Sequence, residues 1–140
     1  MNIEWVIPCR FVEVHDNLAT IIGGGIDNFW LPNEPRIVQA MFALRLTAMP
    51  EELAGQPHRL VNEIRSPSDE VINRAEAELG AQVDEVLNPE WLQGLTLAGG
   101  VQFQANEPGT YTVTHRVDDS EHSLPFHIHH NVPAGTQPPG

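Results

Sequence analysis

Lysine is absent from this 140-residue sequence, in which all seven basic residues are arginines and 19 residues are acidic. The absence excludes a Schiff-base lysine, a lysine general base and the lysine of a phosphate-binding loop. A formal charge of −12 also opposes binding to polyanions. We therefore expect neither nucleic acid nor a membrane surface among the partners.

Cysteine and long apolar runs are also scarce. Cys9 is the only cysteine, so the sequence has no partner for an internal disulfide, and its apolar neighbours predict a buried thiol. No apolar run approaches the length that crosses a bilayer. The first residues lack the basic and apolar pattern of a signal peptide. From these exclusions we expect a cytoplasmic protein.

The length and the 41% hydrophobic content suit one domain with its own core. We predict that residues 1–130 form this domain. Residues 131–140 contain three prolines and two glycines, which predicts a flexible tail.

Short alternations of apolar and polar residues, separated by turn residues, predict strands along most of the chain. Residues 3–14 begin with one such alternation, from Ile3 to Phe11, and residues 36–49 carry the clearest one. Residues 50–57 read as a polar loop. The pattern predicts an all-β fold: an antiparallel immunoglobulin-like or C2-like β-sandwich of about eight strands.

Residues 66–80 fit two structures. Ser66 and the proline after it are typical of a helix start, and Gly80 is typical of a helix end. In contrast, residues 75–79 alternate alanine or leucine with glutamate, as a strand would. We predict a hairpin here, with one short helix between residues 66 and 92 as the alternative.

Three segments together resemble a family of short, uncharacterised bacterial proteins, a domain of unknown function. They are IEWVIPCRFVEV followed by LATIIGGGIDNFW, then NEPGTYTVTHRVDD, and finally LPFHIH. The resemblance covers most of residues 3–129. It implies a β-sandwich fold and implies no activity. The helix-like signal at residues 66–90 departs from the family pattern and affects the expected number of strands.

The histidines are the best candidates for chemistry. His127 and His129 lie two apart on a predicted strand, so they share a face, with Cβ atoms about 6.5–7 Å apart. Imidazoles at this spacing can bind zinc or another divalent transition metal. His115 is the candidate third ligand, because it precedes a turn centred near residue 120 by about as much as His127 follows it. The alternative is a solvent-facing strand that binds no metal.

Exposed apolar residues are the best candidates for a protein interface. Phe29, Trp30 and Leu31 are three consecutive apolar residues at a strand end, so at least one of them should face solvent. Trp91, in a polar loop, is a second candidate. The alternative for the first segment is a strand buried on both faces.

Our first hypothesis is a non-catalytic binding or assembly module, oligomeric and without a cofactor. It would bind a protein partner or itself, because sandwich edges need covering and no serine elbow is present. One alternative is a metal-dependent enzyme that uses the His127–His129 pair. The other is an acidic inhibitor or mimic that docks on a basic protein surface.

Overall fold

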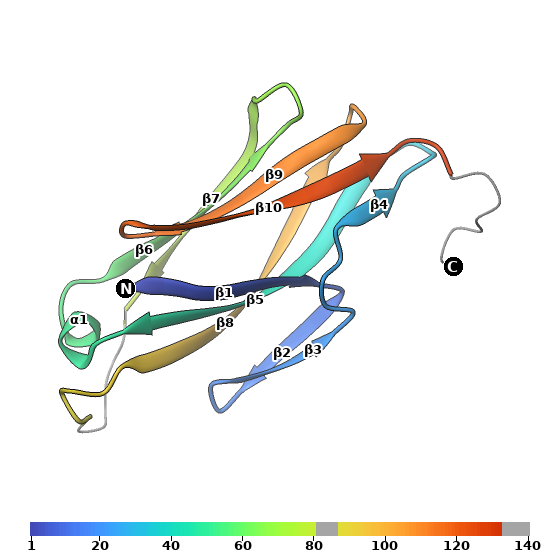
Figure 1. Ribbon diagram of the computed structural model, residues 1–140. Helices are drawn as coiled ribbons and strands as arrows, with labels where there is room; N and C mark the ends of the chain where they lie inside the picture. The colour runs from blue at the N-terminus through green and yellow to red at the C-terminus, as the bar shows by residue number, and fades with distance from the viewer. Residues whose placement is uncertain (81–86, 133–140) are drawn as a thin grey trace.

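The computed structural model describes residues 1–80 and 87–132, which contain ten strands and one short helix (Figure 1). The elements are β1 (Asn2–Cys9), β2 (Phe11–His15), β3 (Leu18–Ile22), β4 (Asn28–Trp30), β5 (Ile37–Ala48), α1 (Pro50–Ala54), β6 (His58–Arg65), β7 (Val71–Leu79), β8 (Gln93–Gln104), β9 (Gly109–Val117) and β10 (Ser120–His129). The described part of the chain holds no helix long and apolar enough to cross a bilayer. The predicted all-β sandwich is confirmed.

The strands form three sheets. One has the order β1-β5-β8, the second has the order β4-β10-β9-β6-β7, and the β2–β3 hairpin is the third. Every described pairing is antiparallel except that of β4 with β10. Figure 1 shows the hairpin beside the three-stranded sheet, away from the five-stranded one.

The core lies between the two larger sheets. The alternation predicted for β5 places every second side chain on its inner face, where Phe42 stacks on Phe126 of β10 with ring centroids 5.8 Å apart. Each such fully buried side chain contributes roughly 1.5–3 kcal/mol. The buried residues of β5, β9 and β10 that fill this core are Val38, Ala40, Phe42, Leu44, Leu46, Ala48, Tyr111, Val113, Val117, Phe126 and Ile128.

A smaller apolar cluster lies on the outer face of the three-stranded sheet, beneath the β2–β3 hairpin. Cys9, Val12 and Ala43 are buried there, so the prediction of a buried thiol is confirmed. Burial raises the pKa of Cys9, which keeps this thiol protonated at neutral pH.

The predicted single strand over residues 3–14 is wrong in one respect, because the chain breaks at Arg10 and passes from one sheet to another. A register shift between Ile3 and Trp5 also reverses the side-chain faces. Ile3 packs on the main core, whereas Trp5 packs under the hairpin. Phe11, expected on the same face, is 46% exposed. This break, together with the short β4, raises the number of strands from about eight to ten.

The hairpin predicted for residues 66–80 is confirmed. Ser66 N–H donates to the Glu70 carbonyl at 2.8 Å and closes the turn before β7. The helix alternative is wrong for residues 66–80 and 87–92, and residues 81–86 lie outside the described part. The helix lies instead at α1, where a loop was predicted. Its start is marked by Pro50, and Met49 N–H donates to the Glu52 carboxylate at 3.1 Å.

Tyr111 fixes the entry into β9. Its hydroxyl donates to the Glu107 carbonyl at 2.8 Å and accepts from the Glu107 N–H at 3.3 Å. The ring is 1% exposed and packs on Phe103. Gly109, which lies between Glu107 and Tyr111 in the chain, has a φ of +132°, which favours glycine. The arrangement is similar to the tyrosine corner of immunoglobulin-like sandwiches.

We expect Tyr111→Phe to destabilise the fold by about 1–2 kcal/mol, because the aromatic packing stays while both hydrogen bonds to Glu107 are lost. Urea unfolding followed by tryptophan fluorescence measures this change. Equal stability of the variant and the wild type would show that the corner does not hold the turn.

Candidate functional site

The two long sides of the sandwich differ. On one side β1 lies against the five-stranded sheet, and Ile3 N–H donates to Ser120 Oγ at 3.0 Å. On the other side lie the edge strands β7 and β8. Within the described residues, one hydrogen bond joins these two strands, from Asn73 Nδ2 to the Gln102 carbonyl at 3.0 Å. The sandwich is therefore closed along β1 and open between β7 and β8.

β7 is exposed along its whole length. Eight of its nine residues are exposed and the last, Leu79, is half-buried. The strand pairs with β6 on one side only. A sheet edge of this kind presents an unpaired row of backbone N–H and C=O groups, which is a template for another strand.

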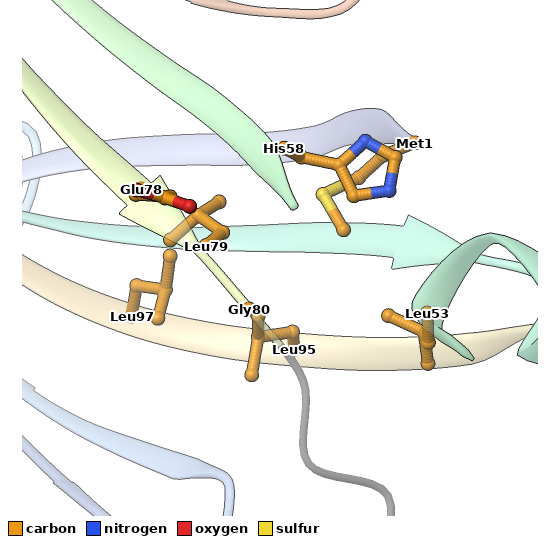
Figure 2. A pocket seen from close by; sticks show the side chains of 8 residues that line it. All are labelled: Met1, Leu53, His58, Glu78, Leu79, Gly80, Leu95 and Leu97. Carbon is orange, nitrogen blue, oxygen red and sulfur yellow. The ribbon is translucent and has the colours of Figure 1, made fainter. Parts of the chain in front are cut away.

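Three cavities follow the opening, and each is lined from both edge strands. The first has a volume of about 190 Å³ and includes Leu79 of β7 and Leu95 and Leu97 of β8, with Met1 and His58 beside them (Figure 2). The second, of about 60 Å³, lies between Ala75 and Gly100 and reaches His115. The third, of about 220 Å³, includes Ile72 and Gln104. The three cavities follow β7 from one end to the other, and we call this row of cavities the trough.

A charged network closes the end of this trough. His58 Nδ1 lies 2.9 Å from Asp118 Oδ2, and its Nε2 lies 3.0 Å from the Glu52 carbonyl. The Met1 amino group contacts the Glu52 carboxylate and lies 3.1 Å from Asp118 Oδ2. These contacts tie α1 and the start of β6 to the β9–β10 turn.

The network favours the charged form of its groups. The Glu52 carbonyl and then the Asp118 carboxylate raise the pKa of His58, since both accept from the protonated ring. Desolvation alone would raise the pKa of Asp118, but its hydrogen bonds from His58 and the Met1 amino group outweigh this and lower it. These groups satisfy one another, so the network acts as a clamp.

His115 is buried at the middle cavity and is 1% exposed. Its Nδ1 lies 2.6 Å from Asn62 Oδ1, so the ring donates from Nδ1, and Phe42 packs against it edge-on at 4.6 Å. Nε2 has no partner within residues 1–80 and 87–132. Burial, and secondarily the charge of His122, lower the pKa of His115 to about 4. The imidazole is therefore neutral at pH 7.

The predicted metal set is not brought together. The β9–β10 hairpin turns at Asp118–Asp119 and not near residue 120, so His122 lies opposite His115 while Thr110 lies opposite His127. His115 points into the core, whereas His127 and His129 alternate with buried residues on the outer side of β10. The assignment of His115 as their third ligand is therefore wrong.

The remaining two histidines bind protein groups. His127 Nδ1 lies 2.9 Å from Thr110 Oγ1, and His129 Nε2 lies 2.8 Å from Asn28 Oδ1. In the part of the chain that the structure describes, no three His, Cys, Asp or Glu side chains are grouped as metal ligands.

The aromatic residues predicted to form an interface lie in three different environments. Phe29 is buried and packs on Phe126 with ring centroids 4.9 Å apart, so it belongs to the core, and its assignment to an exposed patch is wrong. Trp30 is half-buried and stacks on His129 at 5.0 Å. Trp91 is 66% exposed just before β8, and its role in partner binding stays a prediction.

Neither the open edge nor the His58–Asp118 pair is predictable from local sequence. The alternation of residues 75–79 was visible, but nothing local shows that β7 ends a sheet. His58 and Asp118 are 60 residues apart, the first at the start of a strand and the second in a turn. Only the order of the strands brings these features together.

No family model and no curated protein matches the chain. Among solved structures, the chain is similar to a β-glucuronidase from glycoside hydrolase family 2, at 14% sequence identity and a TM-score of 0.42. The similar region covers 64% of this chain and 10% of that enzyme. A likeness this distant supports no inference about activity. The resemblance to the uncharacterised bacterial family stays a prediction.

We expect Asp118→Asn to lower the pKa of His58 toward its ordinary value, because the variant loses the carboxylate that favours the imidazolium. Asparagine suits the positive φ of 49° at this position. NMR titration of the histidine ring protons measures the change. The matched control is Asp119→Asn at the neighbouring exposed position, which should leave the His58 titration unchanged. An unshifted His58 in Asp118→Asn would contradict the clamp.

We also expect His115→Gln to reduce the loss of stability on acidification. A histidine whose pKa is about 4 when folded and 6.5 when unfolded binds more protons in the unfolded state, so its stabilising contribution falls as pH drops through that window. Between pH 7.5 and pH 5 the difference is about 2 kcal/mol. Urea unfolding of both proteins at these two pH values measures it. An equal pH dependence of the two would contradict a neutral, buried His115.

Proposed function

We propose that this chain is a non-catalytic binding module that adds an extended segment of a polypeptide to the β7 edge of its five-stranded sheet. The observation that carries the proposal is the exposure of all nine residues of β7 to some degree, along the open side of the sandwich. Strand addition draws affinity from main-chain hydrogen bonds and specificity from pockets that receive alternate side chains.

The other sheet edges are shorter, or side chains cover part of them. β4 has three residues, and β1 is held against β10 through Ile3 and Ser120. On β8, Asn17 accepts from Thr96 N–H and donates to the Gly94 carbonyl, both at 2.7 Å. Natural sheets commonly protect their edges in such ways.

β7 lacks this protection. Within residues 1–80 and 87–132, no side chain is hydrogen-bonded to the backbone of residues 71–79. Its only described hydrogen bond to β8 is donated by the Asn73 side chain. The free edge of β7 thus remains available to an incoming strand.

The trough beside β7 provides the second element of recognition. Asn73, Ala75 and Ala77 face inward opposite Ile64, Asn62 and Leu60 of β6, and they are small. Side chains on the inner face of an added strand would therefore lie over the cavities instead of over bulky neighbours. The leucines of the first cavity favour an apolar residue at that end.

We expect a photo-reactive residue at position 78, replacing Glu78 on β7, to form a discrete covalent adduct with a polypeptide when cells that make the protein naturally are irradiated. A strand added to β7 would lie within contact distance of this position, about 4.8 Å away between backbones. The adduct is detected and its mass determined by denaturing electrophoresis and mass spectrometry.

The matched control carries the same probe in place of Arg116, on the outer face of β9 inside the same sheet. It should yield no adduct, because Arg116 already lies between Glu121 of β10 and Val61 of β6. Absence of an adduct at position 78, or the same adduct at both positions, would contradict strand addition at β7.

A further inference from the structure

We infer that the segment added to β7 is β7 of a second copy of this chain, antiparallel and related by a two-fold axis through Ala75. The inference rests on the proposed function, and it identifies the partner and the register. It follows from the distribution of charge along the β6–β7 hairpin and from the order of residues in β7.

The outer face of this hairpin is electrically balanced although the chain carries a charge of −12. The register of β6 and β7 places three arginines and three glutamates on it: Arg59, Glu63, Arg65, Arg74, Glu76 and Glu78. Arg74 Nη2 lies 2.8 Å from Glu76 Oε1, and Arg59 Nη1 lies 3.4 Å from Glu76 Oε2. Two acidic copies can approach here with less repulsion than over the rest of the surface.

The order of charges along β7 selects one register. When two copies of β7 pair about Ala75, Arg74 of each copy lies opposite Glu76 of the other, which gives two pairs of opposite charge on the outer face. A two-fold axis keeps the outer faces of both sheets on the same side, so outer residues of one copy lie opposite outer residues of the other. The axis must therefore pass through a residue and cannot lie between two residues.

Neighbouring registers oppose like charges. An axis through Arg74 places that arginine opposite its own copy, and an axis through Glu76 does the same for the glutamate. An axis through Ala77 places Glu76 opposite Glu78 of the other copy, twice. Like charges directly opposite each other destabilise a strand pair, so the Ala75 register is the one that the sequence of β7 favours.

The inner face agrees with this register. Asn73 of each copy lies opposite Ala77 of the other, and both residues face inward in the single chain. At the axis, Ala75 meets Ala75, where small side chains allow close approach. The two five-stranded sheets become one continuous ten-stranded sheet, and each copy covers the open side of the other.

Native mass spectrometry and sedimentation velocity of the purified, untagged chain test the inference, at roughly 100 µM protein because an interface of one strand pair is small. We expect a dimer. Arg74→Glu and Glu76→Arg each place like charges opposite each other, so each should weaken dimerisation at least about 10-fold. Arg116→Glu, the same charge change on the outer face of β9 inside the sheet, is the matched control and should leave the dimer intact.

Complementation makes the test specific. The double variant Arg74→Glu/Glu76→Arg restores two opposite-charge pairs and should dimerise again. An equimolar mixture of the Arg74→Glu chain and the Glu76→Arg chain should form the mixed dimer, because every facing pair in it has opposite charge. Melting temperatures of all variants show that each remains folded.

A wild-type chain that is monomeric at this concentration overturns the inference, and so does a dimer that neither single variant weakens. Either result leaves the proposed function standing if the probe at position 78 still joins a different polypeptide. Absence of any adduct at position 78 removes the proposed function as well. The two failures are therefore distinguishable.

Discussion

The need to satisfy the backbone at the sheet edges shapes this molecule more than any other constraint. Edge N–H and C=O groups must be paired, covered or left in water. Ser120 meets Ile3 on β1, and Asn17 caps Gly94 and Thr96 on β8. β7, in contrast, has no side chain hydrogen-bonded to its backbone in the described part of the chain. The candidate site is thus the long edge that no side chain covers.

Two histidines show how the same architecture sets opposite electrostatic environments. His58 begins β6 at the end of the sandwich, where carbonyl and carboxylate oxygens raise its pKa. His115 lies between the sheets, where burial lowers its pKa to about 4. The contacts of the first favour its imidazolium form, and burial keeps the second neutral against Phe42 and Asn62. The position of each histidine relative to the two sheets therefore decides the direction in which its pKa shifts.

Much of the fold could be predicted from local patterns, whereas the site depends on long-range order. The alternation in β5 is readable because one face is buried and the other is not. The change of face between Ile3 and Trp5 is not readable, because a bulge leaves the composition of a strand unchanged. Likewise Asp118, Asp119 and Ser120 are all turn formers. The predicted turn centre lies about two residues too far along the chain. The prediction therefore placed His127 opposite His115, where the structure has His122.

Net charge, taken alone, argues against self-association of a chain at −12. Placement matters more than the sum, because ions screen charges beyond about 8 Å at physiological salt, whereas facing side chains in a strand pair are closer than that. Six of the seven arginines form ion pairs within the described residues. Arg59, Arg65 and Arg74 belong to the hairpin that carries the free edge. A sequence without lysine thus concentrates nearly half of its arginines beside the strand that is paired on one side only, which is where two acidic copies would need them.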